Sequence, residues 1–269
     1  AYLQIERELF MLRGGQQWNG FGITLAAELI HTGFYFKLKT PVVVELMYGK
    51  LDENGRSDTD VALVLGSDLN LYEDYRSGAV DNATTNDRDQ YALQVSYASE
   101  MFSVGGYFSE NRDRTVLDLD NDQNVFGLWA KANFGMFSFE TEMDFFGGEM
   151  EMGPGVRDID YVGAQFYFLA SVKLSDVFKI DGEFFYAQGT DEGSDSGNFQ
   201  EIQLSCIDNG MDDWVPETMS HLDGMYHVLP SWDIFEPWND SGVVAGQLSL
   251  EFTAAPGLTL HGQMGYAQA

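Results

Sequence analysis

Residues 137–145 read FSFETEMDF, and the side chains at alternate positions of this stretch differ in polarity. One set is largely apolar: Phe137, Phe139, Thr141, Met143 and Phe145. The other set is polar and mostly acidic: Ser138, Glu140, Glu142 and Asp144. Successive side chains of a β-strand point to opposite faces of its sheet, so this stretch predicts a strand with one apolar and one acidic face.

The same alternation returns along most of the chain. Clear strands are predicted over 126–134, 137–145, 161–170, 178–186, 244–252 and 258–266, and weaker ones over about 2–12, 21–30, 34–38, 42–49, 91–98 and 102–109. This gives roughly twelve strands, many of them close to the 9–11 residues with which a tilted strand crosses a bilayer.

The connections between these strands alternate in length. Short turns are predicted at 99–101, 133–136 and 254–257, and long connections rich in Gly, Asp and Asn at 110–124, 147–159 and 188–200. An antiparallel up-and-down sheet places all short turns at one rim and all long loops at the other. Two regions, 50–90 and 201–242, interrupt the pattern: either EIQLSCI at 201–207 belongs to a very long loop, or a strand is hidden there.

Composition excludes several classes of protein. The 269 residues carry 43 acidic and 14 basic side chains, a formal net charge of −29, yet 44% of them are hydrophobic and 14% aromatic. A disordered acidic tail lacks so many aromatic residues, and a nucleic-acid-binding protein needs the opposite charge. The single cysteine, Cys206, cannot form an intrachain disulfide.

Two folds are compatible with the alternation. A soluble β-sandwich or barrel turns its apolar face inward, whereas a transmembrane barrel turns it towards lipid. The charged polar face, an apolar face rich in Phe, Gly and Ala, and aromatic residues near strand ends favour the membrane fold. Those aromatic residues include Tyr48, Tyr97, Tyr107, Tyr186 and Tyr266. The sequence therefore predicts an all-β, transmembrane, antiparallel up-and-down β-barrel, with residues 1–269 as one domain.

Three stretches carry a resemblance to a known family: AYLQIERELF at 1–10, VVVELMYGKLDENG at 42–55 and LSLEFTAAPGLTLHGQMGYA at 248–267. They resemble the Gram-negative outer-membrane porins, in particular those of sulfate-reducing proteobacteria. The resemblance implies an outer-membrane location, a homotrimer and a whole barrel near sixteen strands. The chain begins inside a strand and ends in GYAQA, without the terminal aromatic residue usual in such barrels, so we expect it to be incomplete at both ends.

The leading functional hypothesis is a porin, a water-filled channel for passive diffusion of small hydrophilic solutes and ions, with a preference for cations, no enzymatic activity and no cofactor. Its predicted pore-lining residues are Lys131, Glu140, Glu142, Asp144, Gln165, Lys179, Asp181, Glu183, Gln247 and Glu251. Two alternatives stay open. The acidic residues of these strands could serve a soluble carbohydrate-binding protein or glycosidase, or the barrel could have a plugged interior and a structural or adhesive role.

A calcium site is a further candidate. LDLDNDQN at 117–124 places Asp118, Asp120 and Asp122 at alternate positions, as at the start of an EF-hand loop. Gln123 and Trp129 replace the Gly and Glu that an EF-hand requires at its sixth and twelfth positions, so the motif is not an EF-hand. Loose Ca²⁺ binding by a flexible acidic loop and a merely solvated loop are the two interpretations.

Overall fold

The computed structural model of the chain describes residues 1–23, 28–53, 87–114, 120–151, 158–188, 201–203 and 243–268. Within these residues, thirteen strands form one sheet. Their bounds are β1 Tyr2–Glu6, β2 Phe10–Gly20, β3 Glu28–Leu38, β4 Val42–Glu53, β5 Asp87–Ala98, β6 Phe102–Asp113, β7 Asp120–Phe134, β8 Phe137–Glu151, β9 Ile159–Ser175, β10 Phe178–Ala187, β11 Glu201–Gln203, β12 Val243–Ala255 and β13 Leu258–Gln268. This part of the chain contains no helix that could cross a membrane.

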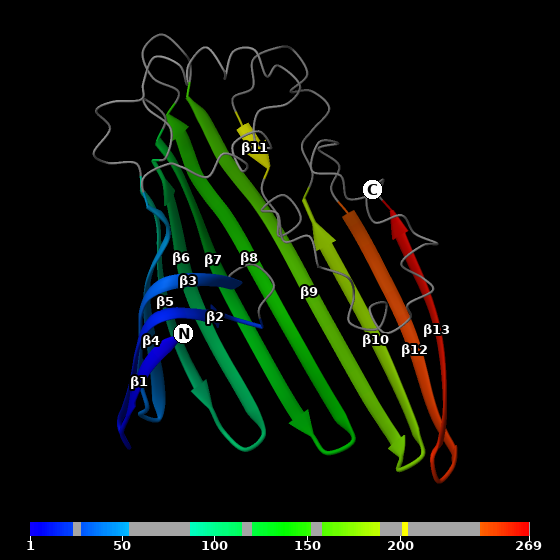
Figure 1. The fold of residues 1–269 in the computed structure, drawn as a ribbon. Coiled ribbons are helices and arrows are strands. Elements are labelled where there is room, and N and C mark those ends of the chain that lie inside the picture. Colours follow the sequence, from blue (N-terminus) through cyan, green and yellow to red (C-terminus); the bar gives the residue numbers. More distant parts are fainter. Residues whose placement is uncertain are drawn as a thin grey trace.

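The strands follow an up-and-down path. Each strand from β1 to β10, and then β12 and β13, pairs antiparallel with the next. The short β11 lies beside this path and pairs in parallel with β9. The sheet is curved, and its short hairpin turns gather at one end (Figure 1). Among the described residues β1 and β13 do not pair with each other, so both are edge strands. The predicted antiparallel topology is confirmed.

The N-terminal elements differ from the prediction. Residues 2–12 are not one strand, because the chain turns back after β1 with the N–H of Arg7 donating to the carbonyl of Phe10 at 2.8 Å. Alternation continues on both sides of a tight turn and therefore does not locate it. The predicted strand 34–38 is confirmed but is longer, because β3 runs without a break from Glu28 to Leu38. It takes up the end of the predicted strand 21–30, of which Phe21–Ile23 lie outside the sheet.

The predicted long loops are shorter than expected. β6 continues to Asp113 and β7 begins at Asp120, so most of 110–124 is paired strand, and β8 and β9 likewise take up parts of 147–159. Polar residues in this region form rows across neighbouring strands, one of which joins Asp89, Arg112 and Asp122. Loops were predicted here because these stretches are acidic and rich in Gly, Asp and Asn, yet polar side chains that pair across neighbouring strands are equally compatible with a strand. Residues 189–200 and 204–242, including Cys206, lie outside the described part of the chain.

The outer face of the sheet is apolar and exposed. The predicted outward residues are exposed because no neighbour in the described part of the chain covers them. Phe145 is 44% exposed and Leu248 is 45% exposed. The same holds for Phe137, Met143, Phe168, Phe184 and Leu250. Phe139 and Phe166 are half-buried by ring contacts with Phe134 and Phe184 at 6.2 and 6.1 Å. The assignment of these residues to the outer face is confirmed.

The inner face is more mixed than the sequence predicted. It carries buried polar side chains, but also a cluster of buried apolar and aromatic ones over β2 to β9: Met11, Phe21, Tyr35, Met47, Ala92, Tyr107, Val125, Phe146, Met150 and Tyr161. Tyr107 was expected at an outer strand end and is instead 2% exposed on the inner face. Tyr48, Tyr97, Tyr186 and Tyr266 are exposed, as predicted.

An arginine on the outer face should therefore be far more damaging than one on the inner face of the same strand. Phe168→Arg in β9 should lower the free energy of unfolding in lipid vesicles by about 2–4 kcal/mol, because it places a charge in an apolar band. The matched variant Leu169→Arg lies across from Glu140 and Glu183 and should change it little. Urea unfolding of both variants measures the difference. Equal costs would contradict the assigned faces.

Candidate functional site

The ten residues predicted to line a pore share one face of the sheet. They lie on β7 to β10 and β12, and the strand register brings Lys131 opposite Glu140, Asp144 opposite Gln165 and Glu183 opposite Gln247. Both lysines predicted to line the pore form ion pairs: Lys131 Nζ lies 2.8 Å from Glu140 Oε2, and Lys179 Nζ lies 2.9 Å from Asp181 Oδ1. The remaining predicted residues are Glu142, which is fully buried, and Glu251, which is half-exposed.

Glu142 and Asp144 form a buried carboxylate pair on β8. Both side chains are 0% exposed. The Tyr107 hydroxyl donates to Asp144 Oδ1 at 2.7 Å and to Glu142 Oε1 at 3.0 Å, and Gln165 Nε2 donates to Asp144 Oδ2 at 2.7 Å. In the described residues, no basic side chain forms an ion pair with either carboxylate. Hydrogen bonds from uncharged donors therefore satisfy the oxygens of two acids that face no cation among the described residues.

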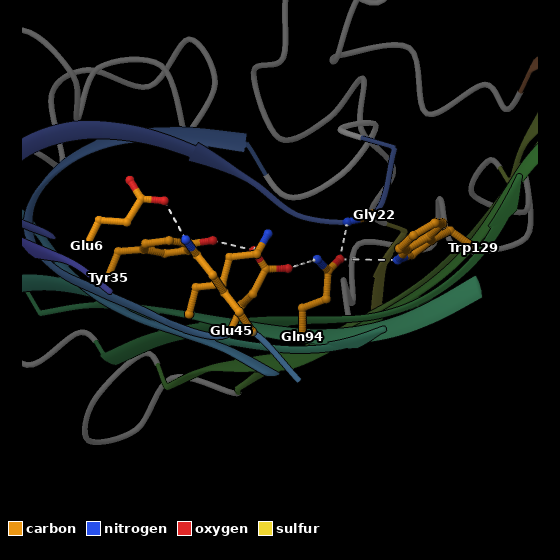
Figure 2. A network of polar contacts seen from close by, with 8 residues as sticks. Glu6, Gly22, Tyr35, Glu45, Gln94 and Trp129 are labelled. Atoms are coloured by element: carbon orange, nitrogen blue, oxygen red, sulfur yellow. Dashed lines mark hydrogen bonds and ion pairs between the residues drawn. The ribbon is translucent and has the colours of Figure 1, made fainter. Parts of the chain in front are cut away.

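A second network lies beside the pair, on β3 to β7 (Figure 2). Glu45 accepts hydrogen bonds from the Tyr35 hydroxyl and from Gln94 Nε2, and Lys37 Nζ lies 3.0 Å from Glu45 Oε1. Gln94 Oε1 in turn accepts from Trp129 Nε1 at 3.1 Å. Gln94 thus joins an acid on β4 to an indole on β7 across three strand boundaries.

The segment Phe21–Ile23 connects the two networks. The N–H of Gly22 donates to Gln94 Oε1 at 2.8 Å, and the N–H of Ile23 donates to Glu142 Oε2. Gly22 has a φ of 66°, in the left-handed region that glycine adopts without strain, and this turns the chain towards the inner face. Phe21, which is 2% exposed, packs in the apolar cluster. The segment is thereby fixed against the wall of β5, β6 and β8.

An open cavity of about 290 Å³ lies nearer the short turns. The Lys131–Glu140 ion pair lines it, together with Ser103, Ser138 and Ser171. The Ser171 hydroxyl also donates to Asp181. The described part of the inner face therefore has an open region of paired charges near the short turns and, farther along the strands, two buried acids without an ion pair.

Two of the three calcium candidates lie in a paired strand. Asp120 and Asp122 belong to β7, where Asp120 Oδ1 lies 3.1 Å from Arg114 Nε, and Asp118 lies outside the described residues. No group of three His, Cys, Asp or Glu side chains that could hold a metal occurs in the described ranges. Loose binding of Ca²⁺, and the absence of any other cofactor, stay predictions.

Half of the site lies outside the residues predicted from the sequence. Tyr35, Glu45, Gln94 and Trp129 lie on strands that were predicted, and Glu45 and Gln94 stand among apolar neighbours at alternate positions. The alternation that marks the acidic face of 137–145 also places Glu45 and Gln94 on the inner face. The contribution of the Gly22 and Ile23 amides carries no signal in the side-chain pattern, because only the backbone takes part.

Comparison with known proteins supports one conclusion about the fold. No family model and no curated protein matches the chain. The solved structures of the outer-membrane protein OmpT of Vibrio cholerae do match. The in-vitro folded trimer form has a TM-score of 0.50 and 11% identity, over 99% of this chain and 69% of that one. The loop L8 deletion mutant of OmpT has a TM-score of 0.50 and 13% identity, over 99% of this chain and 72% of that one.

The fold is that of outer-membrane β-barrels. This confirms the predicted fold class and agrees with the predicted outer-membrane location. At 11–13% identity the likeness concerns the fold alone. The narrower resemblance to porins of sulfate-reducing proteobacteria stays a prediction.

Gln94→Leu should destabilise the protein, because it removes the acceptor of the Gly22 and Trp129 N–H groups and one donor to Glu45. Leaving buried polar groups unsatisfied costs about 1–3 kcal/mol of unfolding free energy. Gln4→Leu is the matched control, since Gln4 also makes two side-chain hydrogen bonds but is exposed. Its effect should stay within about 0.5 kcal/mol in the same urea titration. A cost for Gln94→Leu no larger than that of the control would remove Gln94 from the network.

Proposed function

We propose that the chain forms a water-filled channel in the bacterial outer membrane, through which small hydrophilic solutes and ions diffuse with a preference for cations. The observation that carries the proposal is the carboxylate pair Glu142 and Asp144, buried on the inner face without a basic partner among the described residues. A fold of the outer-membrane barrel class supplies the setting.

The outer face supports a lipid-facing position. Along β8, apolar residues occupy alternate outward positions from Phe137 to Phe145, a length of about 27 Å at about 3.4 Å per residue. A tilted strand of this length suits the hydrocarbon thickness that outer-membrane barrels cross. The described part of the inner face is not comparably apolar, since it combines buried acids and amides with the apolar cluster.

The distribution of charge on the inner face supports cation preference. Lys37, Lys131 and Lys179 each lie beside a carboxylate and so contribute little net positive field. The field of Glu142 and Asp144 is not offset in this way. Low-dielectric walls focus the potential of such groups into a narrow passage, which raises the local concentration of cations.

The segment Phe21–Ile23 would narrow this passage on one side, because it lies against the inner wall at the level of the carboxylate pair. Transport would then be a passive process without a chemical step. This fits an acid pair in which both carboxyl groups already bind the same tyrosine, and in which a backbone amide covers Glu142. A glycosidase needs an acid and a base that can both reach the substrate.

We also propose that the channel assembles as a homotrimer. The sequence resemblance to porins supports this, and one structure of V. cholerae OmpT is described as a trimer form. Light scattering of the detergent-solubilised protein, corrected for bound detergent, tests it through the protein mass of the particle. A mass corresponding to a single chain would contradict the trimer but not the channel.

The channel proposal predicts cation selectivity that depends on salt. In planar bilayers under a potassium chloride gradient, the reversal potential should indicate cation preference in dilute salt and should fall towards zero at about 1 M, where the Debye length is near 3 Å. The double variant Glu142→Gln/Asp144→Asn should reduce the preference in dilute salt, because it removes the only described inner-face acid pair that has no cationic partner.

The matched control neutralises an ion pair instead. Lys131→Met/Glu140→Gln removes one charge of each sign and should leave the reversal potential near its starting value. Failure of the purified protein to conduct at all would overturn the channel, and an anion-selective channel would show that the lysines dominate the field.

A further inference from the structure

Gly127 and Tyr107 are neighbours across the β6–β7 pair. Their Cα atoms are register partners, and the Tyr107 ring leans over Gly127 so closely that an added Cβ would overlap its Cε1 and Cζ atoms. The same Cβ would lie 2.6 Å from Asp144 Oδ1. Neither the ring nor the carboxylate has space to retreat into the sheet, because both are almost fully buried.

The Tyr107 ring also meets the inward segment. A Cβ on Gly22 would lie 2.7 Å from Tyr107 Cε1 and would overlap the Glu142 carboxylate. The ring is therefore in close contact with the wall through Gly127 and with the segment Phe21–Ile23 through Gly22. The ring fits between the wall and the segment because the residue on each side, Gly127 and Gly22, has no side chain.

We propose that Gly127 is a positioning residue that, through the ring of Tyr107, sets where Phe21–Ile23 lies in the channel and thereby keeps the remaining bore open. This rests on the proposed channel function. With a hydrogen atom at position 127, the ring stays against the wall, and the amides of Gly22 and Ile23 reach Gln94 and Glu142.

A methyl group at position 127 would force the ring away from the wall. The ring would push against Gly22, and the two amide hydrogen bonds of the segment would break, because their acceptors belong to the wall itself. The detached segment would then cross the bore from time to time. The ring rather than its hydroxyl determines this position, since the close contacts with both glycines are made by ring carbons.

Hydrogen–deuterium exchange of a peptide that contains Gly22 and Ile23 tests the proposal without relying on conduction. In folded, detergent-solubilised protein, Gly127→Ala should accelerate exchange of these amides about tenfold for each of the two hydrogen bonds that is lost. The control Gly182→Ala should leave exchange unchanged, because a Cβ there meets nothing within 4 Å. Equal exchange in the two variants would overturn the proposal.

Two substitutions of Tyr107 keep the test decisive if Gly127→Ala does not fold. Tyr107→Phe retains the ring and should leave the segment amides protected, whereas Tyr107→Leu removes the ring and should expose them. Fast exchange in both variants would assign the position of the segment to the hydroxyl and so contradict the role of Gly127. Heat-dependent gel mobility identifies the folded fraction of each variant before exchange.

Single-channel recording connects the position of the segment to the bore. Gly127→Ala should show frequent closures that Gly182→Ala and the unsubstituted protein lack. If the unsubstituted protein does not conduct, the channel proposal fails while the exchange result is unaffected. If it conducts and Gly127→Ala records an equally steady current, the link between Gly127 and the bore is wrong.

Discussion

Every other feature of the structure depends on the need to pair the polar groups of a backbone that lies behind an apolar surface. Lipid offers the N–H and C=O groups no partner, so neighbouring strands must bond to each other along their whole length. The antiparallel ladder from β1 to β13 meets this need. Once one face of the ladder is apolar, the period of two assigns the polar side chains at the intervening positions to the other face. The acidic inner face is thus a consequence of the same constraint that exposes Phe145 and Leu248.

Placing many acidic side chains on one face costs free energy, and the structure offsets this cost in two ways. Near the short turns, lysines on the same or the neighbouring strand pair with Glu140 and Asp181. Farther along, Glu142 and Asp144 are surrounded by donors that carry no charge: a phenol, an amide side chain and a backbone N–H. Uncharged donors satisfy the oxygens of the two acids without adding positive charge to the inner face. The first solution, by contrast, places a cation beside each acid.

The sequence predicted the structure well wherever the type of a residue depends on the environment of its side chain. Alternation identified the strands from 126 onwards and the face on which Glu142, Asp144 and Gln165 lie. It could do so because the two faces of a strand lie in different environments and therefore differ in residue type. It failed at the hairpin after Glu6, where both strands keep the same period, and at 110–124, where polar strand and polar loop have the same composition. It could not find Phe21–Ile23 in the site either. That contact depends on backbone amides and on the absence of a Cβ at Gly22 and Gly127, neither of which appears in a hydrophobic pattern.

The charged row of Asp89, Arg112 and Asp122 extends the paired strands beyond the last apolar row of the outer face. These side chains are on the outer face, where the last apolar row contains Phe108 and Phe126. Arg112 lies four positions after Phe108 in β6, about 13 Å along the strand at about 3.3 Å per residue. Strand pairing continues over this whole distance. In the proposed channel, a solute would pass along this paired part of the wall before it reaches the level of the apolar surface.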